Sequence, residues 1–207
     1  MSHNQTRNLH VNPSARLWRY ASPIDCRVVD FHRRFPGFSV TPLVSLDSVA
    51  AELGVRHVFI KDESTRMNLP SFKILGASWA TYRAILLEVN LAVGVSLEEL
   101  SVAARKEKIK LFAATDGNHG RAVARMAKLL GIKADIFISI DLDQITHDII
   151  ASEGARVIVH QGDYDSAVRQ AKIQAETAGG ILIQDTALKG YEEIPQVRCS
   201  HGSANGC

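Results

Sequence analysis

Lys73 is the residue whose type and position most clearly indicate chemistry. It follows Pro70 and Ser71, which predict a helix that begins here with Ser71 as its N-cap. Lys73 then lies in the first helical turn, where the positive end of the helix dipole disfavours an ammonium ion. Schiff-base chemistry needs a neutral amine, so the position suits a lysine that reacts with a carbonyl group. The alternative is a solvated surface charge, which is the usual role of a lysine near a helix start.

A second chemical segment, ATDGNHG at residues 114–120, lies where a predicted strand passes into a predicted helix. Its glycines let the backbone approach a ligand closely, and the first N–H groups of the helix lack partners within the helix. Asn118 offers both a donor and an acceptor. The junction therefore suits an anion or a polar ring substituent. The alternative is an ordinary turn capped by an Asn or Asp side chain.

Strands and helices alternate around these two segments, which predicts an α/β fold with a largely parallel sheet. Upstream, apolar residues at helical spacing over 43–53 predict a helix that ends at Gly54, and residues 58–60 predict a short buried strand. Ser96 and Glu99 form a predicted capping box. The remaining predicted elements are a helix from Lys73 to about Ile85, a loop at 90–95, strands at 111–114, 134–140, 156–160 and 181–184, and helices at 118–130, 144–152 and 164–178.

The composition predicts a globular protein and names no macromolecular partner. The chain has 207 residues, of which 46% are hydrophobic, and 24 basic residues balance 22 acidic ones. We therefore expect no nucleic-acid partner and no membrane partner. No apolar run approaches the roughly 20 residues of a membrane span, and the first ten residues lack the apolar core of a secretory signal. A cytoplasmic location is expected, and the absence of a GxGxxG motif argues against a dinucleotide fold.

The three cysteines do not predict a disulfide framework, because their number is odd and their spacing is wide. Cys199, His201 and Cys207 fit no zinc-ligand spacing, and no fourth ligand is near in the sequence. No metal site is expected.

The segment KDESTRMNLPSFKILGA at 61–77 resembles the cofactor-lysine segment of the fold-type II pyridoxal-phosphate enzymes. This family includes threonine dehydratase, cysteine synthase and the tryptophan synthase beta subunit. The resemblance implies pyridoxal 5'-phosphate as cofactor, carried by Lys73. It also implies that Asn118 contacts the ring hydroxyl of the cofactor and that Gly117 lies beside the cofactor. The implied fold is a three-layer parallel sheet with helices on both faces, tryptophan synthase beta-like.

Asp116 narrows the resemblance to the diaminopropionate ammonia-lyases, because most of the wider family has a serine or threonine there. The stretch from Gln184 to Ala187, followed by Gly190 and Tyr191, also resembles these lyases, and the likeness covers about residues 31–195. It implies α,β-elimination of ammonia from 2,3-diaminopropionate, a small amino-acid substrate, to give pyruvate and ammonia. Lys73 and Asp116 would act as bases on opposite faces of the substrate. Asp185 would hold the β-amino group, with a turn-capping aspartate as the alternative.

The chain departs from this family in ways that predict an incomplete and inactive form. Residues 67–71 differ from the usual lysine segment, and 139–143 lack the usual Pro-Lys-Gly turn. The family binds the cofactor phosphate in the second half of the chain, and the residues at 197–207 do not resemble that continuation. Alternatives are a non-catalytic fragment and a serine or threonine dehydratase-like lyase. Full-length family members are expected to be homodimers.

The implied domain division places a poorly ordered arm at 1–30 and a non-family tail at 196–207. Between them, 31–66 would begin a large cofactor domain, 67–180 would form a small α/β domain, and 181–195 would return to the large domain. The small domain holds most of the predicted strands, so the large domain would be left without most of its sheet.

Overall fold

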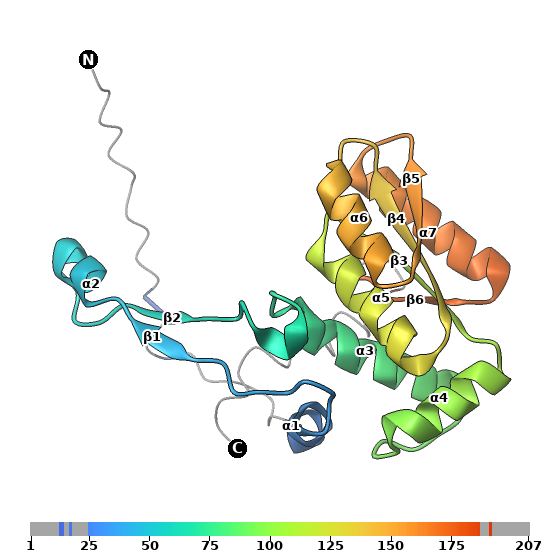
Figure 1. Ribbon diagram of the computed structural model, residues 1–207, viewed down its shortest axis with the longest axis horizontal. Coiled ribbons are helices and arrows are strands. Elements are labelled where there is room, and N and C mark those ends of the chain that lie inside the picture. Colours follow the sequence, from blue (N-terminus) through green and yellow to red (C-terminus); the bar gives the residue numbers. More distant parts are fainter. Residues whose placement is uncertain (1–12, 15–16, 18–24, 187–190, 192–207) are drawn as a thin grey trace.

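The computed structural model describes residues 13–14, 17, 25–186 and 191. The body of the protein is a parallel sheet flanked by helices, and a β-hairpin with a short helix extends from one side of it (Figure 1). Within the described residues, no helix is both long enough and apolar enough to cross a membrane. The expected tail at 196–207, with Cys199, His201 and Cys207, lies outside them.

Four parallel strands form the sheet, in the order β5-β4-β3-β6. The central strand β3 pairs on one side with β4 and on the other with β6, so that Leu111 lies opposite both Ala134 and Ile181. This arrangement confirms the predicted parallel α/β sheet. The strands are β3 (Lys110–Ala114), β4 (Lys133–Ser139), β5 (Arg156–His160) and β6 (Ile181–Leu182).

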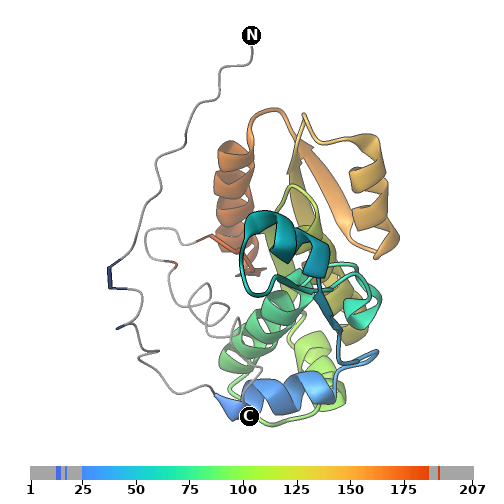
Figure 2. The same ribbon diagram turned by 90° about the vertical axis from the view of Figure 1, so that its left-hand side faces the viewer.

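Helices cover both faces of this sheet. Figure 2 shows α7 (Tyr164–Ala178) on one side of the strands and α6 (Gln144–Ser152) on the other. The alternation of side chains along β3 explains both layers, since Phe112 packs in the cluster that includes α7 while Leu111 packs in the cluster that includes α5 (Asn118–Leu130). The three-layer fold expected from the sequence is confirmed.

Beyond α5 lie two further helices, α3 (Lys73–Glu88) and α4 (Leu97–Lys106), which pack against it and place Lys73 beside the sheet. An additional helix, α1 (Cys26–Arg33), packs against α3. Its Phe31 ring lies 4.7 Å from the Tyr82 ring and 5.3 Å from the Trp79 ring, measured between centroids. These aromatic contacts fix the helix that begins with Lys73.

Several predicted helix ends are confirmed by their caps. Ser96 and Glu99 form the reciprocal capping box at the start of α4. Gly131 ends α5 in the left-handed conformation, where glycine carries no steric cost. Asp143 and Asp163 accept N-terminal N–H groups of α6 and α7. Local sequence signals therefore set the ends of these helices.

The segment before Lys73 differs from its prediction. Leu43 does not begin a helix, because β1 (Leu43–Ser45) pairs in antiparallel fashion with β2 (Phe59–Lys61), and only α2 (Asp47–Leu53) is helical. The strand expected to be buried at 58–60 is open to solvent, since Phe59 is 53% exposed and Ile60 is 50% exposed. Apolar spacing predicted burial here, but among the described residues no further helix or strand pairs with or covers the hairpin.

Two expected domain boundaries fall within or at the start of regular elements. The expected arm at 1–30 contains the start of α1, which Asp25 caps. Val28, Phe31, His32 and Phe35 bury one face of α1 and the turn after it at helical spacing, a signal that the sequence analysis missed. Ile181 and Leu182, where the return to a large domain is expected, pair with β3 in the four-stranded sheet, and the domain division itself stays a prediction.

Candidate active site

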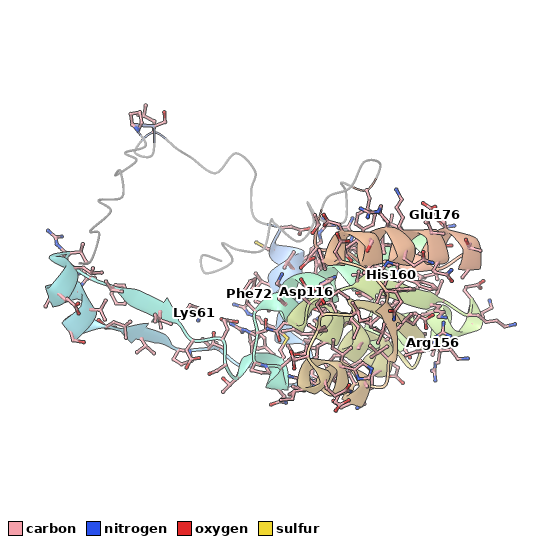
Figure 3. The ribbon with its side chains drawn as sticks, turned by 90° about the horizontal axis from the view of Figure 1, so that it is seen from above. Lys61, Phe72, Asp116, Arg156, His160 and Glu176 are labelled. Carbon is pink, nitrogen blue, oxygen red and sulfur yellow. The ribbon has the colours of Figure 1, made fainter. Side chains whose placement is uncertain are left out.

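Lys73 is the first residue of α3, as predicted, and its side chain is half-buried. The Ser71 hydroxyl accepts the backbone N–H of Lys73 at 3.2 Å, although the helix boundary itself falls at Phe72 rather than at Ser71. Phe72 is exposed, and Figure 3 shows it and Asp116 in the body of the protein, away from the hairpin that carries Lys61. The start of α3 therefore belongs to the body.

A strained turn precedes Lys73. In the short helix η1 (Arg66–Asn68), Met67 and Asn68 have φ angles of 49° and 56°, which non-glycine residues rarely adopt. The buried Arg66 holds this turn through Glu63, with an Nε to Oε2 distance of 2.6 Å, and through the Thr41 hydroxyl at 2.6 Å. This charge-assisted network fixes the approach of the chain to Lys73.

Asp185 is brought to Lys73 by the fold. The Lys73 Nζ atom lies 2.6 Å from Asp185 Oδ2, although 112 residues separate the two in the chain. Asp185 follows β6, and the buried His119 donates from Nε2 to the carbonyl of Ile183 at 2.8 Å, just before Asp185. The start of α5 and the end of β6 are therefore joined beside Lys73.

The loop from β3 to α5 is organised by the buried Thr115. Its Oγ1 accepts the backbone N–H groups of both Gly117 and Gly120 at 2.9 Å. Gly117 caps α5 with a φ of 149°, in the region that favours glycine. Asn118 is the first residue of α5 and is exposed, so its amide is accessible to a ligand.

The Asp116 carboxyl has a raised pKa. Partial burial and the nearby Asp185 carboxylate raise the pKa of the Asp116 carboxyl above its usual range. The residue remains solvent-exposed, so its carboxyl stays accessible. Both aspartates follow strands of the parallel sheet, and Lys73 pairs with Asp185, so these groups lie at the carboxyl-terminal edge, which is where ligands bind in open parallel sheets.

The sequence analysis missed two residues of this site. Gln184 is fully buried, accepts the N–H of Ala114 at 3.0 Å and donates from Nε2 to the Tyr164 hydroxyl at 2.8 Å. Burial, the Asp185 carboxylate and the Asp116 carboxylate raise the pKa of Tyr164, outweighing opposing hydrogen bonds from Thr186 and Gln184. The N-cap at Asp163 signals the start of α7, but nothing local indicates that Tyr164 reaches the carboxylates.

The residues present fit the lysine and ring side of an aldehyde cofactor. A half-buried amine stands at the start of α3, and an exposed asparagine follows a glycine turn at the start of α5. Within the described residues, no group of three or more His, Cys, Asp or Glu side chains is placed to hold a metal ion. Lys73 pairs with Asp185, and the Asp185 carboxylate in turn interacts with Asp116.

Comparison with known proteins identifies the family. Residues 35–196 match the model of the pyridoxal-phosphate-dependent enzymes. The chain belongs to this family. The matched range contains Lys73, the loop at 114–120 and Asp185, which are the parts that the fold brings together.

Two curated relatives carry the same name. The chain is 40% identical to a diaminopropionate ammonia-lyase of Salmonella typhimurium (strain LT2), over 92% of this chain and 48% of the relative. It is 39% identical to that of Escherichia coli (strain K12), over 80% of this chain and 42% of the relative. The chain thus spans about half the length of the curated relatives it matches.

Solved structures of diaminopropionate ammonia-lyase are also similar to this chain. The apo form of Escherichia coli diaminopropionate ammonia-lyase superimposes with a TM-score of 0.78 and 36% identity, covering 84% of this chain and 47% of that chain. The complex of the same enzyme with D-serine gives a TM-score of 0.79 and 36% identity, covering 84% of this chain and 45% of that chain. The fold of the described residues is therefore that of this family.

Proposed function

We propose that this chain forms the lysine-bearing part of a pyridoxal-phosphate-dependent lyase that eliminates ammonia from 2,3-diaminopropionate, giving pyruvate and ammonia. The observation that carries the proposal is the ion pair between the Lys73 amine and the Asp185 carboxylate, and burial together with that carboxylate raises the pKa of the nearby Asp116 carboxyl. When bound, the cofactor supplies the electron sink for the carbanion at the α-carbon. The similarity to the two ammonia-lyases supports the choice of substrate.

The residues have separate roles in this proposal. Lys73 would hold the cofactor through its amine and would also serve as the base for the α-proton on one face of the substrate, while Asp116 would serve on the other. The raised pKa of Asp116 supports its role as a base, because a carboxylate with a higher proton affinity is a stronger base. Asn118 and Gly117 would hold the cofactor ring.

Asp185 binds the β-ammonium group of the substrate. The Lys73 ion pair supports this role, because Asp185 already accepts a primary ammonium at 2.6 Å. Release of Lys73 from this pair would leave the carboxylate available for the substrate amine. The catalytic and binding roles of these five residues stay predictions, as do a homodimeric full-length protein and a cytoplasmic location.

Labelling tests the assignment of Lys73. The full chain is incubated with pyridoxal phosphate, reduced with borohydride and mapped by mass spectrometry. We expect the reduced adduct on Lys73 and its loss in Lys73→Ala. Lys61 serves as the matched position, since it is also half-buried and its amine already donates to the Thr41 carbonyl. An adduct mainly on Lys61 would contradict the assignment.

Product analysis separates the proposed lyase from its alternatives. The chain is produced together with the half of the Salmonella relative that it does not match. Pyruvate from diaminopropionate supports the proposal, whereas ketobutyrate from threonine supports a dehydratase. Such a dehydratase of Pasteurella multocida is 33% identical over 67% of this chain and 23% of that protein. Absence of either product, with the Lys73 adduct also absent, would favour the non-catalytic fragment.

A further inference from the structure

The amino-terminal edge of the parallel sheet carries a cluster of cations, which we call the basic edge. Strands β3, β4 and β5 begin there with Lys110, Lys133 and Arg156, and the parallel register places Lys110 opposite Lys133. The helices α4 and α5 end at the same edge, because each is followed by one of these strands. The basic edge consists of Arg105, Lys106, Lys108, Lys110, Lys128, Lys133 and Arg156.

The turn after α4 joins this helix end to the strand starts. Lys108 has a φ of 53°, which non-glycine residues rarely adopt, and its N–H donates to the Arg105 carbonyl at 3.1 Å. Arg105 also lies against the end of α5, since a Cβ atom on Gly131 would lie 3.3 Å from Arg105 Cδ. Figure 3 shows Arg156 on the side of the body farther from Phe72. The two helix ends and the strand starts therefore form one surface, away from the candidate active site.

Few carboxylates neutralise the basic edge. The buried Asp135 accepts from Lys110 at 2.7 Å and from Arg156 Nε at 3.0 Å. Within the described residues, no salt bridge joins the other members of the basic edge to a carboxylate. The chain as a whole has 24 basic and 22 acidic residues, so its balanced composition conceals a local excess of positive charge.

Compensation of helix dipoles explains only part of this cluster. Cations in the last turns of α4 and α5 lie close to carbonyl groups that lack partners within the helix, and they are favourable there for that reason alone. The cations on the turn and on the strand starts have no such role. Clustered charge of one sign raises the local concentration of oppositely charged partners and speeds their association.

Exposed apolar side chains accompany the cations. Val102 is 56% exposed and precedes Lys106 by one helical turn on α4. Leu129 is 38% exposed and follows Lys128 at the end of α5. A partner that covers the basic edge therefore meets apolar contacts as well as positive charge.

This mixture favours a polypeptide over a nucleic acid. Single-stranded nucleic acids stack their bases on exposed aromatic rings. The Phe112 ring lies 4.9 Å from Lys110 Nζ but is only 1% exposed, so it offers no stacking surface. We propose that the basic edge binds an acidic segment of a partner protein, in which apolar side chains lie between the carboxylates. The inference does not depend on the lyase reaction.

Fluorescence anisotropy on the full 207-residue chain tests the basic edge. The probe is a labelled glutamate-rich peptide with interspersed leucines, and an all-glutamate peptide, a single-stranded RNA and a DNA duplex are compared with it. Lys108→Glu combined with Lys133→Glu reverses two charges of the basic edge. Arg56→Glu combined with Arg169→Glu is the matched control, because both arginines are exposed and lie outside it. Val102→Ser removes an apolar contact without changing the charge.

At about 0.15 M salt, we expect the wild-type chain and the control to bind the leucine-containing peptide equally, and the basic-edge variant to bind at least about tenfold more weakly. Val102→Ser should weaken binding of this peptide but not of the all-glutamate peptide. Thermal unfolding first verifies that each variant is folded.

Several outcomes would overturn the proposal. The first is that the wild-type chain binds neither peptide, and the second is that both charge-reversal variants lose affinity equally. Equal effects of Val102→Ser on the two peptides would remove the apolar contact on which the choice of partner rests. Tighter binding of RNA or DNA than of either peptide, lost in the basic-edge variant, would assign this surface to a nucleic acid instead.

Discussion

The four-stranded sheet and the β1–β2 hairpin both contain mainly apolar strands, but their surroundings differ. In the sheet, α7 covers one face and α5 with α6 covers the other, so that Phe112 is only 1% exposed. In the hairpin the corresponding ring, Phe59, is 53% exposed. Strand composition alone therefore does not decide burial. The number of layers supplied by the rest of the chain decides it.

Truncating these two phenylalanines gives the largest contrast. Phe112→Ala should lower the free energy of unfolding by about 3–5 kcal/mol, because it leaves a cavity in a packed core. Phe59→Ala should lower it by less than about 1 kcal/mol, because the ring is half open to water. Urea denaturation of both variants measures the difference. Equal losses would mean that the hairpin is covered in the isolated chain.

A buried and an exposed glutamate compare covered and open regions in the same way, through the stability lost when each charge is removed. Glu153 joins α6 to α5 by accepting from Arg121 at 3.0 Å and from Arg125 at 2.7 Å, and its side chain is 5% exposed. Glu153→Gln should cost about 2–4 kcal/mol, because it leaves two arginines without their carboxylate. The control Glu176→Gln removes a surface carboxylate that is 65% exposed, 4.0 Å from Lys172, and should cost about 0–0.5 kcal/mol.

The Glu153 contribution should also depend on pH. Burial raises the pKa of Glu153, but hydrogen bonds from Arg125 and Arg121 outweigh burial and hold that pKa below its usual range. A depressed folded-state pKa gives stability that is present above the unfolded value of 4.5 and is lost as the pH falls through the folded value. The gap between wild type and Glu153→Gln should therefore narrow in acid. A gap that stays constant would rule out this linkage.

Glycine substitution compares close packing in the body with open space beside the hairpin. A Cβ atom on Gly120 would lie 2.3 Å from Thr115 Cγ2, so Gly120→Ala should cost about 1–3 kcal/mol. Adding Thr115→Ser removes that methyl group and keeps the hydroxyl, and should recover part of the loss. Gly54→Ala meets no atom within 4 Å but has a φ of 64°, so about 1 kcal/mol is expected. Thermal unfolding of the three variants checks this order.

Substitution of two aspartates should give the smallest changes in Tm, and the two changes should have opposite signs. Asp116 has a raised pKa, so its ionised form is disfavoured in the folded state, and Asp116→Asn should raise the Tm at pH 7 by about one degree. That gain should vanish as the pH falls toward 3.8, where the carboxyl is protonated. At the hairpin, hydrogen bonds from Ser64 lower the pKa of Asp62, so Asp62→Asn should lower the Tm instead. Shifts of the same sign in both variants would contradict these assignments.

The sequence by itself determined the elements of the body and the parts of the site that lie within them. Capping signals act over three or four residues, so Ser96 with Glu99 and the glycine at 131 marked helix ends that the structure confirms. Alternating strands and helices predicted the parallel sheet for the same local reason. Lys73 at a helix start and Asn118 at a strand-to-helix junction were also readable from their neighbours.

Only the tertiary structure decided which residues that are distant in the sequence come into contact. The pairing of Lys73 with Asp185 spans 112 residues and depends on β6 joining β3, which no local pattern encodes. Tyr164 reaches the same carboxylates only because α7 crosses the sheet beside Gln184. The exposure of the hairpin has the same origin: its apolar residues predicted burial, but burial requires covering layers, and the described residues place none over the hairpin.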